Sequence, residues 1–129
     1  MKRHLDWLRQ AERDLAKAKR DLSEGDYEWA CFTSQQAAAE KAVKALLQFR
    51  GVEVRGHTVG EMVEETNAPE ELVDLAKELD HHYIPSRYPD AFASGTPSDH
   101  YTKKMAEEAV KSAERIVEYC RSRITGEIR

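Results

Sequence analysis

The sequence lacks any run of 18 or more apolar residues and contains only two cysteines. A membrane-spanning helix needs about 20 consecutive apolar residues, so we expect no contact with a membrane interior. The basic N-terminus, MKRHLDWLRQAERDL, has no apolar signal core, which argues against secretion. Cys31 and Cys120 fit no zinc or redox spacing. We interpret them as small buried residues in a reduced compartment, the cytoplasm.

The sequence also lacks the common catalytic motifs. It contains no Gly-x-Ser-x-Gly, no Cys-His signature and no glycine-rich phosphate loop. Asp80, His81 and His82, with His100 or His57, suggest a metal site. However, adjacent histidines on a helix diverge by about 100 degrees and rarely bind one ion together. There is no His-x-x-x-His pair either, so we expect neither a metal nor a cofactor.

Positive charge is not in excess, since the net charge is −4. Residues 1–24 and residues 102–129 each hold seven Lys/Arg against five Asp/Glu, whereas residues 50–90 hold four against ten. This distribution excludes a strongly basic footprint for nonspecific nucleic-acid binding. A local basic face on the first and last helices remains an alternative to ordinary solvated helix surfaces.

What the sequence does contain is helical periodicity over almost its whole length. Its 129 residues fit one domain, 1–129. Apolar residues recur at steps of three and four, and glycines, prolines and capping residues separate the periodic segments. We expect helices over 3–24, 27–49, a short segment after Thr58, about 67–82, and from the Thr96 cap to about 124. Short links favour antiparallel neighbours, so the expected fold is all-α, an up-and-down bundle of four to five antiparallel helices.

The segment 27–49 is apolar on most of its circumference, which is typical of a helix at the centre of a bundle or at an interface. Polar residues interrupt it at Gln35, Gln36, Glu40, Lys41 and Lys44. Gln36 and Lys41 are interpreted either as facing a ligand or a dimer seam, or as part of a solvated stripe with ordinary i,i+4 pairs.

The connection YIPSRYPDAFASGTPSDH, from Tyr83 to His100, is much longer than an ordinary link between helices. Its prolines serve to end one helix, stiffen the link and start the next helix. Arg87 is a candidate phosphate clamp, and Tyr83 and Tyr88 are candidates for stacking on a base. Asp90 would orient Arg87 or accept a hydrogen bond from a ribose hydroxyl. The alternative is that Arg87 ties down the loop while the tyrosines pack.

His57 precedes the expected helix start at Thr58. It is a candidate general acid or base, because its unperturbed pKa is about 6.5. Near a helix N-terminus it is also a candidate anion contact. The alternative is a histidine that hydrogen-bonds the nearby loop backbone.

Several of these segments together resemble the HEPN family. They are GDYEWACFTSQQAAAEKAVKALL (25–47), the Gly-His pair 56–57, YIPSRYPDA (83–91) and the long Ala-rich last helix. The resemblance covers roughly residues 3–124. It implies a bundle of four to five helices, usually a homodimer, and for many members a toxin-like pairing with a minimal nucleotidyltransferase. The family was proposed to bind nucleotides.

An active branch of the family cleaves RNA without metal, using an Arg, four to six further residues, and then a His. This sequence departs from that signature, because twelve residues separate Arg87 from His100. Arg50 and His57 have the right spacing, but they lie between the second and third expected helices, earlier than the family's motif. We interpret that match as accidental.

Three hypotheses remain open. The first is a nucleotide- or RNA-binding protein that is the toxin-like partner of a minimal nucleotidyltransferase. The second is a non-catalytic dimeric interaction module. The third is a metal-independent ribonuclease with a non-standard site.

Overall fold

Helices make up most of the computed structural model, which describes residues 3–52 and 58–128. Their order is α1 (His4–Ser23), α2 (Tyr27–Thr33), η1 (Ser34–Glu40), α3 (Lys41–Phe49), α4 (Val59–Glu65), α5 (Glu70–Asp80), η2 (Pro89–Ala91), α6 (Pro97–His100) and α7 (Lys103–Ile128). No strand occurs in these two ranges. The prediction of an all-α, up-and-down bundle is confirmed.

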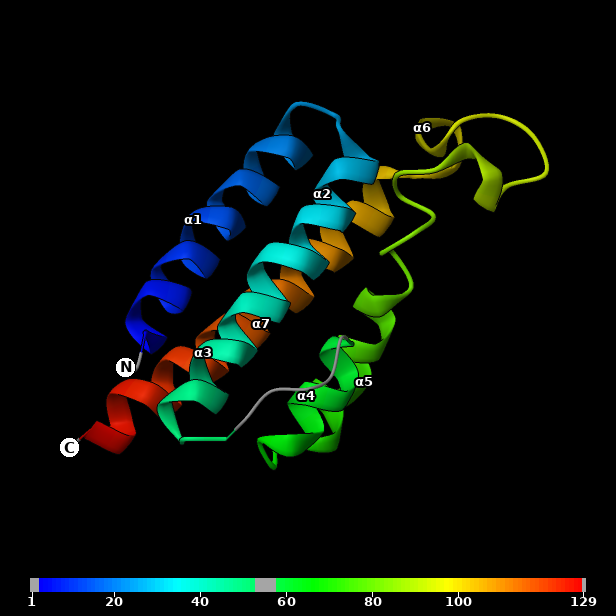
Figure 1. The fold of residues 1–129 in the computed structure, drawn as a ribbon. Coiled ribbons are helices and arrows are strands. Elements are labelled where there is room, and N and C mark those ends of the chain that lie inside the picture. Colours follow the sequence, from blue (N-terminus) through cyan, green and yellow to red (C-terminus); the bar gives the residue numbers. More distant parts are fainter. Residues whose placement is uncertain (1–2, 53–57, 129) are drawn as a thin grey trace.

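The α2–η1–α3 segment forms one continuous rod that packs against α1, α7 and α5 (Figure 1). Along it lie fully buried alanines, whose small side chains let neighbouring helices approach closely: Ala30, Ala38, Ala39, Ala42 and Ala45. Larger side chains such as Leu46, Leu47, Ile116 and Ile124 fill the core around them. The rod is apolar on most sides because other helices of the same protein pack against it.

The middle of this rod is a π-helix, η1, rather than the α-helix that the periodicity predicts. A π turn accommodates one residue more than an α turn, and such turns occur frequently at functional sites. In η1 the extra residue falls in the run SQQAAAE, where the two glutamines interrupt the apolar pattern. The sequence therefore indicates the position of this irregularity but not its geometry.

The last helix also begins differently from the prediction. Thr96 and Asp99 form the expected capping box, but it serves the four-residue α6. The chain is extended at Tyr101, and α7 starts only at Lys103. This break turns the Tyr101 side chain into the protein, where its hydroxyl lies 2.9 Å from His82 Nδ1. Burying the Tyr101 ring with its hydroxyl hydrogen-bonded thus stabilises the protein more than one uninterrupted helix from Pro97 onward would.

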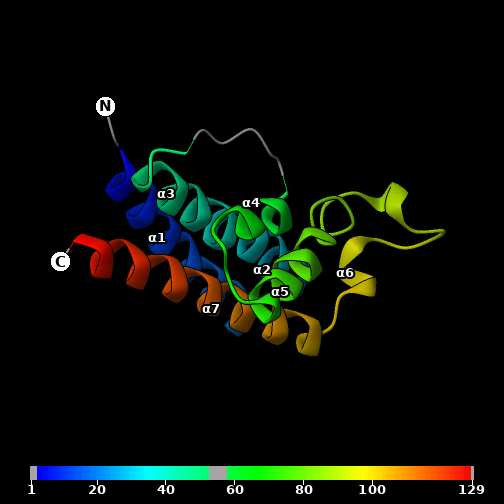
Figure 2. The same cartoon turned by 90° about the horizontal axis from the view of Figure 1, so that it is seen from below.

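Both cysteines are free and buried. Burial raises the pKa of the Cys31 and Cys120 thiols to about 12, which makes them poor nucleophiles. Within the described ranges, no helix is long and apolar enough to cross a membrane. The start of α1 and the end of α7 lie at the same end of the bundle, and the connection with α6 extends from the opposite end (Figure 2).

Candidate functional site

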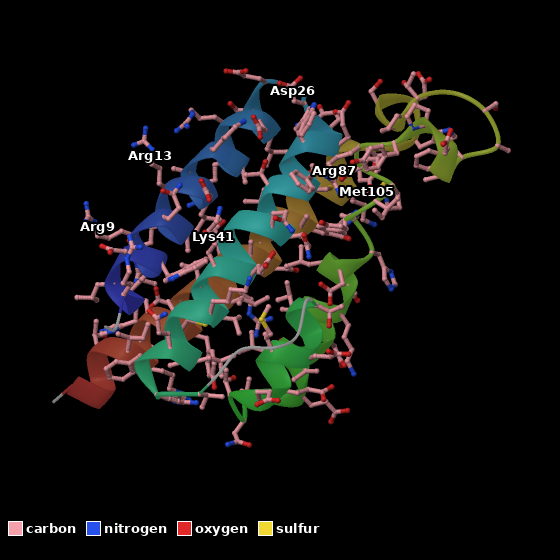
Figure 3. All side chains as sticks on the ribbon, in the orientation of Figure 1. Arg9, Arg13, Asp26, Lys41, Arg87 and Met105 are labelled. Carbon is pink, nitrogen blue, oxygen red and sulfur yellow. The ribbon has the colours of Figure 1, made fainter. Side chains whose placement is uncertain are left out.

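The connection between α5 and α7 passes the N-terminal part of the rod, and Arg87 lies at this crossing (Figure 3). Its Nε donates a 2.9 Å hydrogen bond to the Tyr83 carbonyl. The guanidinium carbon lies 4.4 Å from the ring centroid of Phe32, 4.6 Å from that of Tyr83 and 4.9 Å from that of Tyr88. Three cation–π contacts therefore hold the planar group in place.

The terminal nitrogens of Arg87, Nη1 and Nη2, make no hydrogen bond with any residue that the structure describes. An arginine presents five N–H donors in a fixed fork, and here only the Nε donor is used. The group is thus immobilised by rings and one backbone bond, while the donors that clamp a phosphate or carboxylate remain free.

Further exposed aromatic and aliphatic side chains belong to the same two segments, α2 and the connection after α5. Trp29 stacks edge-on against Phe32 at 5.9 Å, and Phe32 lies 6.3 Å from Tyr83. Of the six large hydrophobic side chains exposed in the described ranges, four belong to this surface: Trp29 (47%), Tyr83 (43%), Ile84 (49%) and Tyr88 (47%). We call these four residues, with Phe32 and Arg87, the aromatic cluster.

The structure brings together three of the five predicted site residues. Tyr83, Arg87 and Tyr88 meet in the aromatic cluster. Asp90 is exposed in η2, and no ion pair links it to Arg87 in the described chain. Its expected role in orienting Arg87 is filled by Phe32 and the Tyr83 carbonyl instead. His57 lies outside the described residues.

Two further residues compared with the ribonuclease signature, His100 and Arg50, make contacts away from Arg87. His100 stacks on Phe92 at 4.0 Å, and its Nε2 lies 2.7 Å from the Ser94 carbonyl oxygen. Arg50 donates from Nη1 to the Thr66 carbonyl, which ties the end of α3 to the α4–α5 turn. Across residues 3–52 and 58–128, no three His, Cys, Asp or Glu side chains gather to hold a metal ion.

Next to the aromatic cluster lies a cleft of about 520 Å³, which we call the η1 cleft. Its described lining consists of Gln35, Gln36, Glu40, Thr58, Asp80, His81, Tyr83, Ile84 and Pro85. This volume is within the range of small-molecule pockets. Tyr83 belongs both to the cleft lining and to the rings around Arg87, so the two features adjoin.

Asp80, at the end of α5, links three of the segments that line this cleft. Its carboxylate accepts hydrogen bonds from the Val59 and Gly60 amides, both at 2.9 Å, and from Gln35 Nε2 at 3.2 Å. The first two donors are orphan N–H groups of the α4 N-terminus, so Asp80 caps that helix from a distance in sequence. Gln35 is only 2% exposed, and Asp80 fixes its orientation.

The same polar network continues along η1. Gln36 Nε2 donates to Glu40 Oε2 at 3.0 Å and to Gln35 Oε1 at 3.4 Å. Lys44 Nζ donates to Glu40 Oε1 at 2.6 Å. The glutamines and Glu40 therefore form one connected row from α3 to Asp80. Lys41, in contrast, pairs with Asp14 of α1 at 2.7 Å and makes an ordinary contact between helices.

Sequence reasoning missed Phe32 and the role of Asp80. Phe32 resembles any other apolar residue of a buried helix, and only the crossing of the connection reveals its contact with Arg87. Asp80 was considered only in a metal site, although a carboxylate near a helix start is also a capping residue. The Gln35-Gln36 pair in an apolar helix was the one signal that pointed to the cleft.

Comparison with known proteins shows the family to which this chain belongs. The model of the HEPN domain matches residues 4–123, and the chain therefore belongs to the HEPN family. It is 35% identical over 125 residues to a protein of Methanocaldococcus jannaschii named as a candidate toxin, covering 87% of this chain and 82% of that protein.

Solved structures of similar proteins share the whole fold. A protein of Thermus thermophilus is 44% identical with a TM-score of 0.88, covering 95% of this chain and 98% of its own. An archaeal HEPN homologue is 48% identical with a TM-score of 0.83, over 96% and 99% of the two chains. A HEPN domain protein of Thermotoga maritima is 41% identical with a TM-score of 0.75, over 93% and 98%.

Proposed function

We propose that this HEPN protein binds a nucleotide or RNA at the aromatic cluster and acts as the toxin-like partner of a minimal nucleotidyltransferase. The observation that carries the binding proposal is Arg87, whose guanidinium is fixed by three rings while both terminal nitrogens stay free of described partners. A phosphate would accept from that fork, and a base would stack on Tyr83 or Tyr88, which are both about half exposed.

The toxin-like role is supported by the relative from Methanocaldococcus jannaschii, whose name carries that description. The nucleotidyltransferase partner is what the family resemblance implies. We also propose one domain over 1–129 acting in the cytoplasm, where free thiols such as those of Cys31 and Cys120 stay reduced. Co-expression with a minimal nucleotidyltransferase encoded beside it, followed by affinity purification, tests the partnership. Purification of the protein alone would contradict it.

The binding proposal is tested with fluorescently labelled AMP and a short labelled RNA, titrated with wild type, Arg87→Ala and Arg13→Ala. Arg13 is the matched control, because it is exposed on α1 and points away from the bundle (Figure 3). We expect Arg87→Ala to weaken binding about tenfold or more, the loss of a charge-assisted bidentate contact. Arg13→Ala should bind like wild type. Equal affinities for wild type and Arg87→Ala, or no binding by either, would overturn the proposal.

A second candidate function, a homodimeric interaction module, is favoured by the exposed apolar side chains of the aromatic cluster. Most apolar residues of the rod do not argue for it, since the protein's own helices cover them, but Trp29 on α2 is 47% exposed. Light scattering of wild type and Trp29→Gln tests this function. We expect a dimer for wild type and dissociation for the variant. A wild-type monomer at micromolar concentration would contradict it.

A further inference from the structure

Among the residues that the structure describes, the lining of the η1 cleft presents hydrogen-bond acceptors but no lysine or arginine side chain. The Asp80 carboxylate already accepts three hydrogen bonds inside the protein, two at Oδ1 and one at Oδ2, so it offers a ligand fewer acceptor positions than Glu40 does. A phosphate entering this cleft would meet the carboxylates of Glu40 and Asp80, of which, in the described chain, only Glu40 has a cationic partner, Lys44, and that lysine lies outside the described lining. The cleft therefore suits a different part of a ligand than Arg87 does.

Most of the free side-chain acceptors in the described lining of the cleft belong to Gln36 and Glu40. Both Nε2 hydrogens of Gln36 are directed at oxygens, those of Glu40 and Gln35. Turning the amide over would set its oxygen against two other acceptors, so the network fixes its orientation. Gln36 Oε1 is left without a partner among the described residues. Each Glu40 oxygen accepts one hydrogen bond and keeps a second lone pair.

Another part of the described lining of the cleft, which we call its apolar wall, is apolar and aromatic. Tyr83, Ile84 and Pro85 line it, and the first two side chains are between 43% and 49% exposed. A flat ring that packs on this wall buries its faces and turns its edge to the acceptors of η1. The chemical group that fits both the apolar wall and these acceptors is a planar heterocycle with N–H donors on its edge.

We propose that the η1 cleft recognises the exocyclic amino group of a nucleobase, through Gln36 Oε1 and the Glu40 carboxylate. This inference rests on the proposed function and names the part of the nucleotide that this neighbouring cleft takes. Tyr83 joins the two subsites, with its ring packed on the Arg87 guanidinium and also lining the cleft. Adenine, cytosine and guanine carry such an amino group, and uracil does not.

The test compares two ligands that differ only in that group, AMP and purine riboside 5′-monophosphate. Because a site built to hydrogen-bond an N–H group rejects an analogue that lacks it, we expect wild type to bind AMP about tenfold tighter or more. Equilibrium competition against labelled AMP gives both affinities. CMP and UMP form a second pair, for which the same preference for the amino-bearing base is expected.

The variant Gln36→Met removes the acceptor and keeps an unbranched side chain of similar length. We expect it to reduce the ratio of the two affinities toward one while binding still depends on Arg87. Gln10→Met makes the same chemical change on α1, where the exposed Gln10 side chain donates a hydrogen bond to Asp14, and should leave the ratio unchanged. Thermal unfolding checks that both variants fold, and the wild-type comparison of ligands needs no variant.

The outcomes separate the two proposals. Equal binding of AMP and purine riboside monophosphate by wild type, with binding still lost in Arg87→Ala, would overturn the base-recognition inference and leave the proposed function standing. A preference that Gln36→Met does not change would also overturn it, because the selectivity would then lie elsewhere. Binding of neither ligand would overturn the proposed function and this inference with it.

Discussion

Asp80 and Arg87 are charged residues close together in the chain, but they differ in how many of their polar atoms have hydrogen-bond partners within the protein. The Asp80 carboxylate accepts three hydrogen bonds from its own protein. The Arg87 guanidinium is held by aromatic rings and one carbonyl, and its Nη atoms have no described partner. A satisfied charge holds a fold together, whereas an immobilised and unsatisfied one is available for a ligand. This contrast, which the sequence alone does not show, separates scaffold from site.

The strongest test of the scaffold side is Asp80→Ala. The change leaves the Val59 and Gly60 amides without their cap and frees the buried Gln35 amide. We expect the free energy of unfolding to fall by about 2 to 3 kcal/mol, as measured by urea denaturation. Asp74→Ala, on the exposed side of the same helix, should change it little. Similar midpoints for the two variants would show that Asp80 is not the cap described above.

A smaller loss is expected where α4 approaches α5. A Cβ added at Gly60 would lie 2.7 Å from Lys77 Cγ and 3.3 Å from Asp80 Oδ2. Gly60→Ala should therefore destabilise the protein by about 1 kcal/mol, because the overlap exceeds the gain in helix propensity. Gly126→Ala in α7 meets no atom within 4 Å and should stabilise by about 0.5 kcal/mol. Thermal unfolding that moves in the same direction for both variants would contradict this interpretation.

On the site side, Arg87→Ala should affect stability less than Asp80→Ala does. Cation–π contacts at exposed rings contribute about 0.5 to 1 kcal/mol, and no buried group loses its hydrogen-bond partner. We expect a loss of at most about 1 kcal/mol in urea denaturation, together with the loss of ligand binding described above. Destabilisation as large as that of Asp80→Ala would show that Arg87 has a structural role, like Asp80.

The sequence predicted the helical bundle because apolar periodicity, glycine stops and capping residues act locally. The cap at Thr58 illustrates this, since its side chain accepts from the Glu61 amide as the Thr-x-x-Glu pattern predicts. Asp26 shows the limit: it occupies the N-cap position of α2 but makes no side-chain capping bond. Local patterns place an element, and the tertiary surroundings decide which of its polar groups are used.

The candidate site was predicted less completely, because it depends on contacts between distant segments. Tyr83, Arg87 and Tyr88 were found because unusual residues gathered in one long connection. Phe32 could not be found in this way, since nothing local separates it from a core residue. The π-helix geometry of η1 was equally out of reach, because a helix of either kind satisfies the same apolar pattern.

The smallest expected effect concerns pH and the contact that starts α7. Burial lowers the pKa of the His82 imidazole below its usual 6.5, and the neighbouring His81 adds to this shift. Burial also raises the pKa of the Tyr101 hydroxyl, so both partners stay neutral near pH 7. The folded protein thus holds His82 as a neutral ring hydrogen-bonded to Tyr101.

Because the pKa of His82 is lower in the folded state, the unfolded chain binds its proton first as the pH falls. The contribution of His82 to the free energy of unfolding should therefore be constant above about pH 6.5 and decrease below that pH. Urea midpoints at about pH 7.5 and about pH 5.5 measure the decrease. We expect His82→Gln to lose less stability on acidification than wild type, because glutamine does not titrate. His81→Gln, at an exposed position, removes only the smaller contribution to the lowered pKa of His82 and should keep most of the wild-type loss. An equal loss in all three proteins would show that His82 does not set the pH dependence.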